Sequence, residues 1–223
     1  PGKIGIFSKK SLRYFIKLLF LIYYHRKILM SKIIAICGPD RCGKETQTAA
    51  LRDYFLSIGK TCQTVEVPIK ACFTYPIIYW MLRNGMAKSF PNFFQVLQFL
   101  NRKIFEIFFL SRLEKKNDII IFDRWSLSML VYGEAGGASS NFSKFLAGLI
   151  RNPDHTIILL GNSFPHEAED VYEADKKLQE SVKIGYFSWS VKNIDKCSLV
   201  SANQEKEQVT NRILESLRVK SII

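Results

Sequence analysis

The sequence predicts an α/β fold with a central parallel sheet of about five strands and helices on both faces. Short apolar segments rich in β-branched residues alternate along the chain with longer segments of helical character. Motifs with charged residues follow two of the apolar segments, where parallel strands of such folds present their ligand-binding ends. The chain has 223 residues, of which 48% are hydrophobic, enough for one domain of this class.

The first predicted strand is Lys32–Cys37, and a glycine-containing loop follows it at residues 38–46. Gly38 and Gly43 allow the backbone torsions that turn successive N–H groups toward one point. The N-terminus of the next helix adds the positive end of its dipole there, and Lys44 adds a mobile cation. A strand, a glycine loop and a helix in this order are typical of a phosphate-binding P-loop, so we expect a nucleoside triphosphate as ligand. A glycine turn that binds nothing is the alternative.

The predicted triphosphate site has an unusual residue at the position of a metal ligand. A serine or threonine usually follows the P-loop lysine and ligates Mg²⁺, but here Glu45 follows it and Thr46 comes one residue later. Glu45 therefore has two interpretations: it ligates Mg²⁺ directly or through water, or it repels phosphate and lowers the affinity. The residues expected to bind the nucleotide are Gly38, Pro39, Asp40, Arg41, Cys42, Gly43, Lys44, Glu45 and Thr46.

The other elements follow from apolar periodicity and from the glycines and prolines that bound it. The predicted strands are Thr61–Val67 before Pro68, Asp118–Phe122, Thr156–Leu160 after Pro153, and Ser198–Val200. The predicted helices are Glu45–Ser57 before Gly59, Tyr75–Asn84 before Gly85, Asn92–Lys116, Ser126–Tyr132, Phe142–Ile150, Glu167–Trp189 and Glu205–Arg218. The segment Asn92–Lys116 has apolar residues on several faces, which predicts burial or a homodimer interface.

The strand ending at Phe122 is followed by Asp123-Arg124. An aspartate at the end of a buried strand beside a P-loop is placed to hold Mg²⁺ or its water ligands, and an adjacent arginine can bind phosphate with a forked pair of donors. We therefore expect a magnesium site at Glu45 and Asp123 and a second phosphate site at Arg124. The alternative is structural: Asp123 caps the helix that starts at Ser126, and Arg124 pairs with it.

Cysteine content and charge restrict the class of protein. The five cysteines form no C-x-x-C pair, which argues against zinc and for reduced thiols in the cytoplasm. Cys42 is either a reactive thiol of lowered pKa or, more simply, a small residue filling the loop. The net charge is +12, but seven positive charges precede Met30 with no acidic residue among them, so nucleic-acid binding is not required.

Residues 1–30 are predicted to be a basic, apolar tail, separate from a domain at residues 31–223. The apolar run Leu12–Tyr24 is shorter than the ~20 residues of a transmembrane helix, and no small-residue cleavage site suggests a secretory signal. The tail is interpreted either as a basic helix that contacts a membrane or a partner or, as we favour, as sequence upstream of a start at Met30.

Two motifs together resemble the signatures of the thymidylate kinase family. Residues Gly38–Lys44 resemble its P-loop pattern G-x-D-R-x-G-K, and Asp123–Tyr132 resembles its second pattern D-R-[YWH]-x-x-S-x-x-x-Y. Three weaker likenesses are Leu97–Arg102, Pro153–Leu160 and Asp170–Glu173. The resemblance extends from about Lys32 to the last helix and implies a P-loop kinase fold.

The resemblance implies a role for each matching residue. Lys44 and the loop amides would hold the donor phosphates, Asp40 would contact the deoxyribose 3′-hydroxyl, and Arg41 would reach the transferred phosphoryl group. The family supplies this basic residue either from the P-loop or from the lid. Because the chain has no lysine or arginine between Gly161 and Asp175, it resembles the branch of the family whose P-loop carries the arginine. The implied catalytic residues are Arg41, Lys44, Asp123 and Arg124, and the implied acceptor-binding residues are Asp40, Pro68, Phe99, Arg102, Arg124, Ser128 and Tyr132.

Departures from the family pattern concentrate on the acceptor side. Gln98 stands where the family stacks an aromatic residue on thymine, with Phe94 and Phe99 as substitutes, and Gly133 replaces a usual glutamine. Gly161 replaces a usual aspartate, and Lys70 replaces a frequent arginine.

The predicted function is Mg²⁺-dependent transfer of the γ-phosphoryl group of ATP to dTMP. The first alternative is a related nucleotide or deoxynucleoside kinase that accepts another base. The second is a nucleotide-binding protein without catalytic activity, weakened by Glu45.

Overall fold

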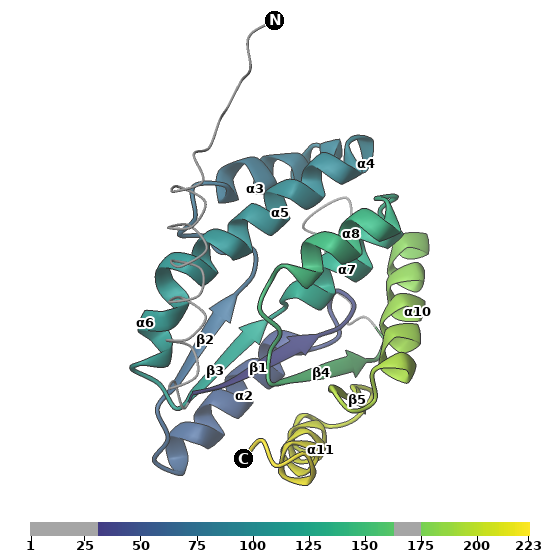
Figure 1. Cartoon of the computed structure of the whole chain (residues 1–223). Coiled ribbons are helices and arrows are strands. Elements are labelled where there is room, and N and C mark those ends of the chain that lie inside the picture. The colour runs from purple at the N-terminus through teal and green to yellow at the C-terminus, as the bar shows by residue number, and fades with distance from the viewer. Residues whose placement is uncertain (1–30, 163–174) are drawn as a thin grey trace, which may run out of the picture. The chain divides into compact units, whose positions relative to one another are not determined.

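Five parallel strands form one sheet in the order β2-β3-β1-β4-β5 in the computed structural model, which describes residues 31–162 and 175–223 (Figure 1). The strands are β1 Lys32–Cys37, β2 Cys62–Glu66, β3 Ile119–Asp123, β4 His155–Leu160 and β5 Cys197–Ser201. The predicted parallel sheet of five strands is confirmed, and no strand end differs from its predicted position by more than one residue.

Helices cover both faces of this sheet (Figure 1). One face carries α2 Lys44–Ser57 and α11 Lys206–Val219. The opposite face carries α3 Tyr75–Arg83, α5 Pro91–Phe105, α7 Ser126–Ala135, α8 Ser140–Gly148 and α10 Lys176–Lys192. The fold is therefore of the predicted class, an α/β sheet with helices on both faces.

The alternation of side chains along the strands divides the core into two layers. In β1, Ile34 and Ile36 pack with α2 and α11, whereas Ile33, Ala35 and Cys37 pack on the other face. All five of these side chains are at most 2% exposed. Because β1 lies in the middle of the sheet and is buried on both faces, it reads in the sequence as a continuous apolar run.

The helix predicted over Asn92–Lys116 is not a uniform α-helix. It consists of α5, a π-helical turn η2 Glu106–Leu110, and a short helix α6 Ser111–Glu114. Glu106, which is 2% exposed, accepts hydrogen bonds from the Lys103 ammonium and from the Arg151 backbone N–H at 3.2 and 3.0 Å. The contact with Arg151 joins the π turn to the loop after α8, and it could not be read from helical periodicity.

Two further predictions differ from the structure or lie outside it. A short helix, α4 Met86–Ser89, follows Gly85 and was not predicted. The helix predicted over Glu167–Trp189 is observed only as α10, because residues 163–174 lie outside the described residues. The tail at residues 1–30 and the segment Asp170–Glu173 also lie outside them. Within the described part of the chain, no helix combines the length and hydropathy needed to cross a bilayer.

His155 at the start of β4 makes folding stability sensitive to pH. Its ring is 1% exposed and its Nε2 lies 2.9 Å from the Ser198 hydroxyl. Burial, assisted by the positive charge of Lys220, lowers the pKa of His155 from 6.5 to about 4. The imidazole thus takes up a proton more readily in the unfolded chain than in the folded one. The part of the folding free energy that depends on this histidine is therefore fully present above pH 6.5 and is lost as the pH falls toward 4.

We expect this histidine to remove on the order of 2 kcal/mol of stability between pH 7 and pH 4. Urea denaturation of wild type and of His155→Gln at both pH values measures the effect. The variant should lose less stability on acidification than wild type, and an equal loss in both proteins would contradict the assignment.

Candidate functional site

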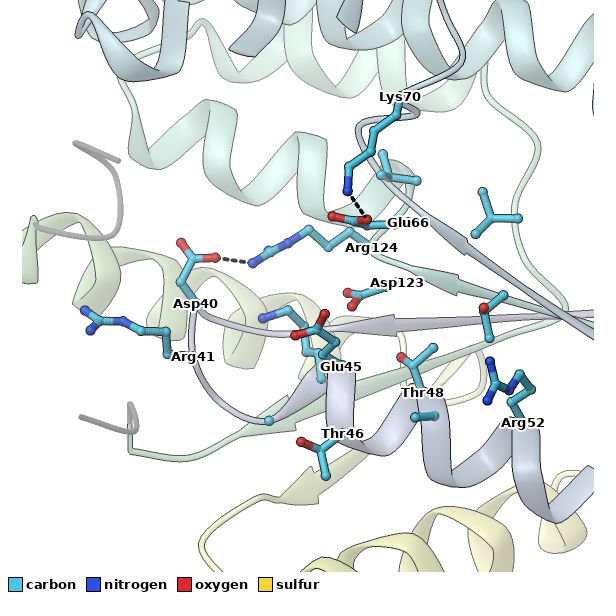
Figure 2. A pocket seen from close by; sticks show the side chains of 16 residues that line it. Asp40, Arg41, Glu45, Thr46, Thr48, Arg52, Glu66, Lys70, Asp123 and Arg124 are labelled. Carbon is cyan, nitrogen blue, oxygen red and sulfur yellow. Dashed lines mark hydrogen bonds and ion pairs between the residues drawn. The ribbon is translucent and has the colours of Figure 1, made fainter. Parts of the chain in front are cut away.

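A polar cavity of about 870 Å³ opens at the carboxyl edge of the sheet, between the start of α2 and the ends of β2 and β3 (Figure 2). Both charged motifs of the sequence line it, as the parallel topology predicts. Its walls are formed by Asp40, Arg41, Gly43, Lys44, Glu45, Thr46, Thr48, Ala49, Arg52, Thr64, Val65, Glu66, Val67, Lys70, Asp123 and Arg124.

The backbone of the loop after β1 requires its two glycines. Gly38 has φ +155°, and a Cβ at this residue would lie 2.4 Å from the Leu159 carbonyl oxygen of β4. Gly43 is in the left-handed region at φ 86° and begins helix α2. Any larger residue at position 38 would push the loop away from the neighbouring strand, so both glycines serve the geometry of a P-loop.

Cys42 fills the space under this loop. Its side chain is 1% exposed, and its Sγ lies 3.6 Å from the Leu159 carbonyl oxygen. Burial raises the pKa of the thiol above its ordinary value of 9.0, although the charge of Lys44 acts in the opposite direction. The structure therefore favours the simpler interpretation of Cys42 as a loop filler.

The Lys44 side chain is folded under the loop and buried. It is 7% exposed, and its ammonium group donates a hydrogen bond to the Pro39 carbonyl. Burial and the nearby charge of Arg124 lower its pKa below the ordinary value of 10.5. An anion bound in the cavity would stabilise the charged ammonium group, because Coulomb attraction is strong where water is excluded.

Arg124 and Asp40 form an ion pair across the cavity, drawn as a dashed line in Figure 2. The Arg124 guanidinium also donates to the Gly38 carbonyl oxygen at 3.3 Å and lies 5.0 Å from the centre of the Tyr132 ring. Its backbone is in the left-handed region at φ 69° and its N–H donates to the Ile36 carbonyl at 2.8 Å. This strained backbone turns the arginine toward the loop, a feature that concentrates at functional sites.

The Asp40 carboxylate is held by a third element, helix α10. The Gln179 amide donates to Asp40 Oδ2 at 2.7 Å and accepts from the Asp40 backbone N–H at 3.1 Å. Burial by itself would raise the pKa of Asp40, but the charges of Arg124 and Lys44 and the Gln179 hydrogen bond lower it below 3.8. Asp40 is therefore ionised at neutral pH and fixed in one orientation.

Asp123 ends β3 beside this ion pair. Its Oδ1 is buried and has no hydrogen-bond partner within residues 31–162 and 175–223. Burial raises the pKa of Asp123 above 3.8, although the charges of Arg124 and Lys44 oppose the shift. A buried carboxylate oxygen without a partner fits a cation.

The structural alternative for Asp123-Arg124 does not match the observed contacts. Trp125 is the N-cap of α7, no side chain caps that helix, and Arg124 pairs with Asp40 instead of Asp123.

Five of the predicted acceptor residues do not line the cavity: Pro68, Phe99, Arg102, Ser128 and Tyr132. Arg102 is 2% exposed and donates to the Gln98 side chain and to its carbonyl oxygen, both four residues earlier on α5. Burial lowers the pKa of Arg102 to about 9. The Ser128 hydroxyl accepts from Tyr186 at 2.8 Å. Gln98, which stands in place of an aromatic residue, thus orients the arginine of the same helix.

Gln95 of α5 occupies the space that a side chain at position 133 would need. A Cβ on Gly133 would lie 2.0 Å from the Gln95 Nε2 atom. Gln95 is 2% exposed, and its Oε1 has no hydrogen-bond partner among the described residues. A carboxamide is therefore present beside α7, although it comes from a different helix than the family pattern suggested.

Several residues of the site were missed by sequence analysis. Thr48 and Arg52 follow Lys44 at intervals of four residues, so the helical repeat could have placed them on the same face of α2. Glu66 is the partner of Asp123 in the β2–β3 register, and its carboxylate pairs with Lys70 at 2.9 Å. No local signal connects Gln179 with Asp40, because 139 residues separate them.

The sheet, the glycine loop and the arginine after β3 define an α/β P-loop kinase fold. The fold is thymidylate kinase-like. A thymidylate kinase from Candida albicans superposes with a TM-score of 0.69 and 20% identity over 86% of this chain and 93% of that chain. A thymidylate kinase from Ehrlichia chaffeensis superposes with a TM-score of 0.65 and 19% identity over 84% of this chain and 98% of that chain. The sequence itself matches no protein-family model and no curated protein.

Proposed function

We propose that this protein is a nucleoside monophosphate kinase that transfers the γ-phosphoryl group of ATP to dTMP. The observation that carries the proposal is the single cavity that contains both Lys44 of the loop and Arg124 after β3. Phosphoryl transfer from a nucleoside triphosphate to a nucleoside monophosphate requires the phosphates of the two substrates to meet, with positive charge around the transferred group. The thymidylate kinase-like fold supports the same function.

In this proposal each charged residue holds one substrate. Lys44 and the backbone N–H groups of the loop bind the ATP phosphates, and Arg124 binds the phosphate of the acceptor. Asp40, fixed by Gln179, accepts a hydrogen bond from the sugar hydroxyl of the acceptor. Arg41 lines the cavity with its backbone at φ 58°, and we assign it to the phosphoryl group in transit.

Magnesium fits the oxygen atoms of this cavity. The buried Oδ1 of Asp123 is without a partner among the described residues, and the Glu45 carboxylate lines the same space. Carboxylates are the ligands that Mg²⁺ prefers. Bound there with ATP, the ion would neutralise phosphate charge. Glu45 is thus proposed to favour metal binding, which argues against the interpretation as a weakened, catalytically inactive protein.

A kinase with a different acceptor base is the second candidate function. It is favoured by the contact of Gln98 with Arg102, since no aromatic residue occupies the position from which the family stacks on thymine. Gln95 beside Gly133 changes the polar surface further.

A coupled assay of ADP release tests both candidates on the full chain with ATP and Mg²⁺. Each deoxynucleoside monophosphate and each deoxynucleoside serves as acceptor in turn. Preferred turnover of dTMP supports the first candidate, preference for another acceptor supports the second, and ATP binding without any turnover would reject both.

A homodimer remains part of the proposal. Phe94, Leu97 and Phe105 of the segment predicted over Asn92–Lys116 are buried, but Phe93, Leu100 and Ile107, at intervals of seven residues, stay 56%, 37% and 50% exposed. An apolar patch of this kind is typical of an interface. Sedimentation velocity should give twice the monomer mass, and a purely monomeric species would reject the homodimer.

We expect the free thiols of the chain to be kept reduced in the cytoplasm.

A further inference from the structure

The hydroxyl that a P-loop protein usually supplies directly after its lysine is absent at position 45, but another hydroxyl lies in the same cavity. Thr48 of α2 is 7% exposed and lines the cavity together with Glu45 and Asp123. Figure 2 shows its oxygen on the side that faces these two carboxylates. Residues 45 and 48 are separated by three positions in a helix, so both side chains project from one face.

The Thr48 hydroxyl is unusual for a threonine in a helix. Such a hydroxyl normally bonds the carbonyl of the preceding turn, but Thr48 Oγ1 has no hydrogen-bond partner in the described part of the chain. Asp123 Oδ1 is the second buried oxygen without a partner that belongs to this cavity. Buried polar atoms are rarely left unpaired, because desolvation without a new bond costs free energy.

These two oxygens, one neutral and one anionic, suit a hard divalent cation better than an anion or an organic ligand. Hydroxyl, carboxylate and water oxygens are the donors that Mg²⁺ and Mn²⁺ prefer. Glu45, one turn earlier in the helix, adds a carboxylate on a longer side chain. The Glu66 carboxylate lines the same cavity but is paired with the Lys70 ammonium group at 2.9 Å. The positive charges of Lys44 and Arg124 remain on the loop side, where phosphate would complete the coordination.

We propose that Thr48 is a ligand of the divalent cation, directly or through one water, together with Asp123 and Glu45. In this proposal the hydroxyl ligand comes from position 48 of α2 instead of position 45, and a carboxylate stands at position 45. The inference rests on the proposed kinase function for the nucleotide that accompanies the metal, but it concerns the metal site alone.

Thr48→Val tests the proposal, because valine keeps the shape of threonine and removes only the hydroxyl. The affinity of the protein–ADP complex for Mn²⁺, followed by the electron paramagnetic resonance signal of free Mn²⁺, should fall by ~10–100-fold. The affinity for ADP without metal should change less than twofold. The melting temperature of the ligand-free variant should equal or exceed that of wild type, since an unpaired buried hydroxyl is removed.

Two further variants separate a ligand from a packing residue. Thr48→Ser keeps the hydroxyl and should restore most of the Mn²⁺ affinity. Thr64→Val makes the same chemical change in the same cavity, two residues before Glu66 on β2, and should leave the Mn²⁺ affinity unchanged. Unchanged Mn²⁺ affinity in Thr48→Val, or an equal loss of ADP affinity without metal, would overturn the proposal.

The outcome is independent of the proposed function. Mn²⁺ binding that depends on Thr48 in a protein that phosphorylates no nucleotide would uphold the metal site and reject the kinase. If the protein phosphorylates a nucleotide but its Mn²⁺ affinity does not depend on Thr48, the kinase is upheld and the metal site is rejected.

Discussion

Replacing Lys44 with methionine is expected to lower phosphoryl transfer at least ~1,000-fold without lowering the stability of the ligand-free protein. Methionine has a similar length but no charge, so the loop loses the ammonium group that lies against its backbone and lines the cavity. In the free protein the ammonium group is buried, and its pKa is lowered by burial and by Arg124, so its charge costs folding free energy.

Steady-state kinetics and thermal denaturation of Lys44→Met measure the two effects. Lys60→Met, which changes an exposed lysine after α2, is the matched control and should alter neither. Retention of more than a tenth of the activity in Lys44→Met would show that the loop does not hold the donor phosphates.

Replacing Arg124 with methionine is expected to reduce both activity and stability. The phosphate of the acceptor loses the forked pair of hydrogen-bond donors of the arginine. The value of kcat/KM for the acceptor should therefore fall ~1,000-fold, whereas the KM for ATP should change little. The Asp40 carboxylate loses its ion-pair partner while it stays buried. The free energy of unfolding should decrease by about 2–3 kcal/mol, less than for a fully isolated charge because Gln179 still bonds Asp40.

The double variant Asp40→Asn/Arg124→Met separates these two effects. It should recover most of the lost stability, because no unpaired charge remains, but none of the lost activity. Arg112→Met on the exposed side of α6 is the control for a general loss of charge. Wild-type stability in Arg124→Met, measured by urea denaturation, would show that the ion pair contributes little to folding.

The fold could be predicted from local sequence because its signals are local. Continuous apolar runs mark strands buried on both faces, and glycines and prolines bound them, as in Lys32–Cys37 before Gly38. Where tertiary contacts decide the backbone, the prediction was wrong: Glu106 bonds the loop before β4 from inside a π turn, which no periodicity reports.

The candidate site was predicted only where its residues belong to a contiguous motif. Asp40, Arg41 and residues 43–46 of the loop meet Asp123-Arg124 in one cavity because parallel strands end at the same edge of the sheet, whereas Gly38, Pro39 and Cys42 do not line it. Gln179, which fixes Asp40, and Gln95, which fills the space beside Gly133, come from distant helices, and nothing in their neighbours along the chain indicates these contacts.

The sequence by itself determined the class of fold, the glycine loop after the first strand and the position of a second cationic residue, because each depends on residues that are neighbours in the chain. Only the tertiary structure decided the surroundings of the site residues: Arg124 pairs with Asp40, Arg102 is held by Gln98 away from the cavity wall, and Thr48 lines the same cavity as Asp123. The physical reason is that charge pairing and burial depend on distances across the sheet and between helices, which packing sets and sequence spacing does not.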